Sequence, residues 1–178
     1  MRILLSSAFI LICSLALNAQ VEMNSVRTVA VIKGSYIYNF AKSCNWDESF
    51  YEEDIFRIAV YGDRELHDEL LDKYSTRSIN NQIVEVIWVT DLDRLSNEQL
   101  VFVSKFKEKE IAKASALCEE NSSLLITDFD GALSRGSVIN FTVIDNMISY
   151  DLNEMQARKN LVLLGTRTKS WANKIIEK

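Results

Sequence analysis

The feature that most constrains the fold of this chain is a series of short apolar runs, each closed by polar turn residues. The first run is 56–62, which ends in Gly-Asp, and Asp63 is suited to cap the helical pattern that follows. Comparable runs lie at residues 83–89, 100–104, 123–127, 138–144 and 147–152. Runs that alternate with helical patterns favour a mostly parallel sheet with helices on both faces. We therefore expect an α/β fold, a three-layer sandwich of five or six strands.

The end of this series departs from the parallel pattern. Asp145-Asn146 alone separates the last two runs, and both residues tolerate positive φ, so an antiparallel hairpin is expected near the C-terminus. Helices are expected at residues 25–43 and 105–119, and a closing helix at the end of the chain. The closing helix would bury Trp171, Ala172, Ile175 and Ile176, and the first helix would bury Val29, Ile32, Tyr36, Phe40 and Cys44.

Residues 1–19 have the order of a secretory signal peptide. Arg2 supplies the positive start, residues 3–17 carry no charge, and small Ala19 stands at the expected cut. The apolar run is shorter than the ~20 residues of a membrane-spanning helix. We expect cleavage near Ala19 and a single domain over residues 20–178.

Charge and cysteine content limit the possible partners and crosslinks. The net charge is −5 and no basic stripe is present, so nothing in the sequence favours nucleic-acid binding. Cys44 and Cys118 would survive cleavage. Outside the cytosol they are able to form one disulfide, but two small buried thiols fit the sequence equally well.

Two groups of residues are candidates for binding. In open α/β sheets, ligands bind beyond the carboxyl ends of the strands, where the strand order reverses. The ligand-binding residues predicted on this basis are Gly62, Asp63, Ser104, Asp128 and Gly136. The acidic loop after the first helix carries Trp46, Phe50 and Tyr51. These aromatic residues would either anchor the loop to the core or, if exposed, bind a partner.

Catalytic motifs are incomplete. Asp128 and Asp130, followed by Gly131, resemble the nucleophile and general acid of haloacid-dehalogenase-type phosphatases, which use Mg²⁺. That chemistry needs a later Ser or Thr, a Lys and an acidic pair, for which the remaining chain leaves little room. The only histidine, His67, stands among acidic residues on an expected solvated helix face. We therefore expect neither an enzyme nor a protein that binds a metal or cofactor, with a phosphatase as a remote alternative.

Three segments carry a resemblance to a known family. Residues 31–50 (VIKGSYIYNFAKSCNWDESF), residues 56–63 (FRIAVYGD) and residues 136–176 occur in the order and spacing of one family. The chain thus resembles the YfiR family of periplasmic regulatory proteins over nearly its whole mature length. Cysteines common in the family's first strand are absent here, and Asp47 stands after Trp46 where proline is usual. Disulfide-based regulation is therefore not carried over.

The resemblance implies a periplasmic protein without chemistry of its own. It would bind an inner-membrane signalling protein, a diguanylate cyclase or a histidine kinase, and restrain it by contact. Relatives are often dimeric, so a homodimer is also implied. The alternative from the residues themselves is a periplasmic small-ligand sensor that uses the crevice at the strand ends.

Overall fold

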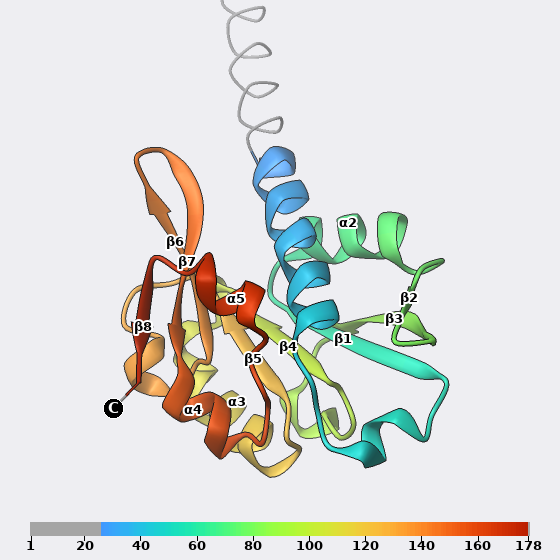
Figure 1. Cartoon of the computed structure of the whole chain (residues 1–178). Helices are drawn as coiled ribbons and strands as arrows, with labels where there is room; N and C mark the ends of the chain where they lie inside the picture. Colours follow the sequence, from blue (N-terminus) through green and yellow to red (C-terminus); the bar gives the residue numbers. More distant parts are fainter. Residues whose placement is uncertain (1–25, 178) are drawn as a thin grey trace, which may run out of the picture.

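A computed structural model describes residues 26–177 of the chain, and the predicted signal peptide at residues 1–19 lies outside them. One sheet of eight strands runs through the molecule in the order β2-β3-β1-β4-β5-β6-β7-β8 (Figure 1). The strands are β1 (Ile55–Tyr61), β2 (Ser78–Ile79), β3 (Gln82–Val89), β4 (Leu100–Val103), β5 (Leu124–Thr127), β6 (Ile139–Ile144), β7 (Met147–Asn153) and β8 (Lys174–Ile176). The α/β class and the mostly parallel sheet are confirmed.

Helices flank this sheet on both faces. The N-terminal helix spans residues 26–43, and the other α-helices are α2 (Arg64–Tyr74), α3 (Ile111–Glu120), α4 (Glu154–Lys159) and α5 (Thr166–Ser170). Short 3-10 turns are η1 (Glu48–Tyr51), η2 (Leu92–Arg94), η3 (Lys105–Glu110) and η4 (Leu133–Arg135). The expected helix at 105–119 is divided, because Lys107 has non-helical dihedral angles and the α-helix begins only at Ile111.

The prediction of five or six strands was wrong, because both ends of the sheet carry a short extra strand. β2 pairs with β3 through a turn at Asn80-Asn81, whose φ angles are 50° and 73°. Two residues are too few to show a strand's alternating pattern. The expected closing helix is also wrong: α5 ends at Ser170, and Ile175 pairs with Leu152 of β7 in strand β8. Ile175 and Ile176 are β-branched and lie beside an unpaired edge of β7, which favours a strand over a helix.

The predicted hairpin is confirmed. β6 and β7 pair antiparallel from Ile139↔Leu152 to Ile144↔Met147. Asp145 and Asn146 adopt φ angles of 48° and 64° in the turn, as the sequence predicts. The hairpin projects beyond the rest of the sheet, beside the upper end of the N-terminal helix (Figure 1).

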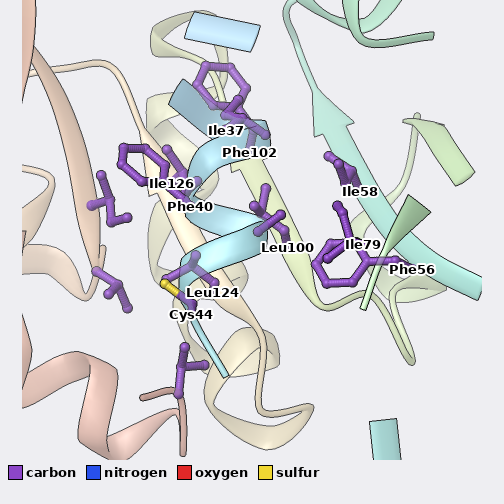
Figure 2. Close-up of a cluster of buried hydrophobic side chains, with 14 of the residues drawn as sticks. Ile37, Phe40, Cys44, Phe56, Ile58, Ile79, Leu100, Phe102, Leu124 and Ile126 are labelled. Atoms are coloured by element: carbon purple, nitrogen blue, oxygen red, sulfur yellow. The ribbon is translucent and has the colours of Figure 1, made fainter. Parts of the chain in front are cut away.

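Alternate residues of the central strands build two separate cores. On β1, Ile58 and Val60 face the larger core with the N-terminal helix and α2, whereas Ala59 and Tyr61 face the smaller core with α3. Figure 2 shows the larger core, in which Ile37, Phe40 and Cys44 of the N-terminal helix meet Phe56, Ile58, Leu100, Phe102, Leu124 and Ile126 of the strands. The central strands β1, β4 and β5 are therefore buried on both faces.

The two cysteines lie in different cores. Cys44 belongs to the larger core and Cys118 of α3 to the smaller one, and both are free and buried. Burial raises the pKa of each thiol above its ordinary value, because a thiolate would lose its hydration. The alternative of two small buried residues is the one that the structure adopts.

This arrangement predicts the thiol chemistry of the mature protein. Without reductant, both thiols should resist alkylation in the native state and react fully in denaturant, because the thiolate form is disfavoured only while the sheet separates and buries them. Mass spectrometry after iodoacetamide treatment measures this. A denatured, unreduced protein without reactive thiols would contradict the structure.

Candidate functional site at the carboxyl ends of the strands

One buried cation holds the N-terminal helix against the strand ends. Lys33 lies on the inner face of this helix with Ala30 and Ile37, and its side chain is 9% exposed. Its Nζ lies 2.5 Å from Oδ2 of Asp128 and 3.8 Å from Oδ2 of Asp63. A charge is buried at a large free-energy penalty unless opposite charges replace its water, and these two carboxylates supply them.

Each carboxylate is placed by the strand that precedes it. Asp128 follows β5 directly, and its Oδ1 accepts the backbone N–H of Lys105 at 2.6 Å, just beyond β4. Asp63 follows β1 and caps α2, because its Oδ1 accepts the backbone N–H of Leu66 at 3.0 Å. The network of Lys33, Asp63 and Asp128 therefore joins the ends of β1, β4 and β5 to the N-terminal helix.

The structure gathers four of the five predicted ligand-binding residues at this edge of the sheet. They are Gly62, Asp63, Ser104 and Asp128. Gly136 lies elsewhere, against Ser115 of α3, whose hydroxyl donates to the Gly136 carbonyl at 3.5 Å. Its φ of 101° lets it end η4, so Gly136 serves a turn on the α3 side.

The crevice expected where the strand order reverses is filled. This point lies between β1 and β4, at Gly62 and Ser104. A Cβ on Gly62 would come 2.5 Å from Cγ of Lys107, which shows how closely that side chain covers the turn. The Nζ of Lys107 lies 4.6 Å from the centre of the Tyr61 ring. The open space lies farther along the same edge of the sheet.

That open space is a cavity of about 240 Å³ between the N-terminal helix and the β6–β7 hairpin. Its polar side carries Lys33, Asp128, Lys105 and Thr142, and its apolar side carries Val29, Phe141, Val143 and Ile148. The hydroxyl of Thr142 is buried without a hydrogen-bond partner among the described residues. A cavity with apolar walls and a few convergent polar groups is the usual form of a binding site.

Exposed aliphatic side chains stand on the two elements that border this cavity, and two of them, Val29 and Val143, line it. Val26 and Val29 on the helix are 50% and 38% exposed, and Val143 and Met147 on the hairpin are 71% and 68% exposed. We call these four residues the helix–hairpin rim. The sequence predicted Val29 in the buried stripe of the helix, together with Ile32, but Ile32 is also 37% exposed. The helix instead turns Ala30, Lys33 and Ile37 inward, which hydrophobic spacing alone does not reveal.

The aromatic loop contributes no comparable surface. Trp46 is buried and packs edge-to-face on Phe56, with ring centres 5.3 Å apart. Its backbone N–H donates to the Tyr51 hydroxyl at 3.2 Å, and Phe50 packs partly buried against the larger core. Of the three predicted partner-binding residues, only Tyr51 keeps an exposed side chain. The structure thus adopts the alternative in which these aromatic residues anchor the loop.

The geometry lends no support to the phosphatase alternative. Asp128 is held by Lys33 and by a backbone N–H, while Asp130 is exposed. His67 is buried rather than solvated, because its ring packs edge-on against Trp88 at 5.6 Å and its Nδ1 lies 2.7 Å from Asp68. Within residues 26–177 there is no group of three or more His, Cys, Asp or Glu side chains placed to hold a metal ion.

Comparison with known proteins gives one family. The family model described as YfiR/HmsC-like matches residues 30–166, well over half of the chain. No curated protein matches. A solved structure that matches is a conserved domain protein from Vibrio cholerae O1 biovar eltor, with 7% identity and a TM-score of 0.48. The match covers 67% of this chain and 54% of that one, so this chain spans about half the length of that structure.

The buried ion pair predicts a large effect of one substitution. Lys33→Met should lower the free energy of unfolding by about 3 kcal/mol, because Asp128 would stay buried without its cation. Urea unfolding of the mature protein measures this. Lys109→Met is the matched control, since Lys109 is exposed and should change stability by less than about 0.5 kcal/mol. Equal effects of the two substitutions would contradict the role given to Lys33.

Proposed function

We propose, because the chain belongs to the YfiR/HmsC-like family, that it binds an inner-membrane signalling enzyme and restrains it. Members of this family are periplasmic regulators. The enzyme would be a diguanylate cyclase, with a histidine kinase as the other possible target. Residues 1–19 would direct export and be removed near Ala19. Within residues 26–177, no helix has both the length and the apolar character that a membrane span requires.

The observation that carries the proposal is the helix–hairpin rim. Val143 and Met147 stand on a hairpin that projects from the sheet, and Val26 and Val29 stand on the helix beside it (Figure 1). Large aliphatic side chains exposed beside a cavity are typical of a surface that another molecule covers. Lys33 and Asp128 fix the helix against the sheet below, so the two halves of the rim keep their spacing.

Restraint would follow from binding alone. A regulator shifts its partner between two states only by the difference in its affinity for them. A tenfold reduction in the active population requires a difference of about 1.4 kcal/mol in binding free energy. Burial of one or two aliphatic side chains in a matching pocket is of that size. No catalytic group is needed for this function.

The cavity supports a second candidate, a small-ligand sensor. Its volume of about 240 Å³ suits a molecule smaller than most drugs. The Thr142 hydroxyl, which lacks a partner among the described residues, would hydrogen-bond the ligand. A sensor would be stabilised by its ligand in the absence of membranes, whereas a contact regulator would need its membrane partner.

The first experiment identifies the partner. Crosslinking in intact cells followed by purification of the mature protein should capture an inner-membrane cyclase, and deletion of the gene should raise cyclic-di-GMP. Unchanged cyclic-di-GMP without a captured cyclase would contradict the cyclase proposal. Capture of a histidine kinase, with altered phosphorylation of its target, would favour the other partner class.

The rim makes a sharper prediction. Val143→Asp and Met147→Asp should each weaken capture of the partner by about 10-fold or more, because a carboxylate would be desolvated in the interface. Both substitutions should leave the melting temperature nearly unchanged, since these side chains are exposed.

Leu71→Asp is the matched control, because Leu71 is 43% exposed on α2, outside the rim. The Leu71→Asp variant should capture the partner and lower the raised cyclic-di-GMP level of the deletion strain as the wild type does. If the rim variants complement as well as Leu71→Asp, the rim is not the binding surface.

A further inference from the structure

One phenylalanine at the carboxyl edge of the sheet is largely exposed. Phe106 is 76% exposed, the largest fraction among the large hydrophobic side chains of residues 26–177. It belongs to η3, the turn that follows β4, and packs into neither core. The Nζ of Lys105 lies 5.4 Å from the centre of its ring. Most of the apolar surface of this ring therefore faces water.

The backbone of this turn is held in place by the rest of the protein. At its start, the backbone N–H of Lys105 donates to Asp128 at 2.6 Å. In its middle, the carbonyl of Glu108 accepts a hydrogen bond from the guanidinium of Arg135 at 2.6 Å. The exposure of Phe106 is therefore set by a fixed backbone.

Lysines alternate along the same turn. Lys107 is directed toward the protein, since its Nζ lies 4.6 Å from the centre of the Tyr61 ring and 3.8 Å from Oε1 of Glu110. Lys105 and Lys109 are exposed and have no ion pair among the described residues. Three lysines against two glutamates give η3 a net charge of +1, in a chain whose net charge is −5.

An exposed aromatic ring between unpaired lysines suits a lipid surface better than a protein partner. Lysine is depleted in protein–protein interfaces. At a lipid surface, an aromatic ring enters the boundary between the headgroups and the acyl chains, while lysine side chains extend to keep their ammonium groups at the phosphates. An anionic surface adds an attraction for each lysine.

We propose that Phe106 inserts into the anionic lipid surface of the inner membrane, with Lys105 and Lys109 on lipid phosphates to either side. This inference rests on the proposed function for its location, because that function places the protein against an inner-membrane partner. One aromatic ring and two lysines give weak, reversible binding, which a stable membrane anchor exceeds. The contact would orient the protein on the membrane without fixing it there.

Lipid contact at this turn would bring the helix–hairpin rim close to the membrane. Lys105 lines the cavity together with Val29 and Val143 of the rim. Phe106 therefore lies beside the rim, at the same edge of the sheet. A protein held by Phe106 would meet its membrane-embedded partner at a raised effective concentration.

Sedimentation of the purified mature protein with vesicles tests this contact. The wild type should bind equimolar phosphatidylglycerol–phosphatidylcholine vesicles, and should bind phosphatidylcholine alone, or the mixed vesicles in added salt, about 10-fold less strongly. Phe106→Ser should lower the partition coefficient on the mixed vesicles about 10-fold or more. Lys105→Gln combined with Lys109→Gln should lower it by a similar factor.

Matched controls are available far from this turn. Leu163 is 67% exposed and pairs with Asn45, just beyond the C-terminal end of the N-terminal helix, whereas the rim lies at the start of that helix. Leu163→Ser should leave vesicle binding nearly unchanged. Lys159→Gln combined with Lys174→Gln removes two charges from exposed positions on α4 and β8, and should also leave it nearly unchanged.

Fluorescence separates insertion of the ring from adsorption of the protein. In Phe106→Trp, brominated lipid should quench the emission of the added indole, whereas in Leu163→Trp it should not. Failure of the wild type to bind anionic vesicles, equal binding by Phe106→Ser, or unquenched emission from Phe106→Trp would each overturn the lipid contact.

These outcomes are distinct from failure of the proposed function, because the vesicles contain no partner and capture of the partner is measured in cells. If Phe106→Ser weakens that capture while the wild type does not bind vesicles, the ring contacts the protein partner, and the lipid contact is again overturned.

Discussion

The ion pair between Lys33 and Asp128 is the interaction on which the functional end of this molecule depends. A lysine on the inner face of the N-terminal helix is compatible with burial only because Asp128 and Asp63 stand at the ends of β5 and β1. In return, it fixes the helix at the carboxyl edge of the sheet. The cavity and the helix–hairpin rim exist because the helix is held there, beside a hairpin that extends past the strands.

The strands were predictable because a strand buried on both faces is a continuous apolar run. The hairpin turn was predictable because Asp145 and Asn146 both tolerate the positive φ angles that they adopt there. The wrong predictions of secondary structure arise where contact with a distant part of the chain determines the local conformation. Ile175 and Ile176 fit a helix by spacing, but an open edge of β7 was available to pair with them. In the candidate site, Asp63 and Asp128 were predicted because they follow the ends of strands. Lys33 was missed, because its position in the helical sequence does not reveal that it is buried beside two carboxylates.

Two surfaces of the molecule are left without an occupant by the described chain, and they differ in chemistry. The rim offers exposed aliphatic side chains beside a cavity with a polar side, which suits a partner's side chains or a small ligand. The turn at Phe106 offers one exposed aromatic ring between lysines, which suits a lipid surface. Their position at the same edge of the sheet lets one molecule use both at once. A family of periplasmic regulators needs no more than such binding surfaces to act.

Hydrogen exchange on the mature protein, alone and with membranes that contain its captured partner, tests the central claim most directly. We predict added protection at the first turns of the N-terminal helix and in the β6–β7 hairpin, because both halves of the rim would be covered together. Protection confined to other regions, such as the aromatic loop at residues 44–54, would contradict it.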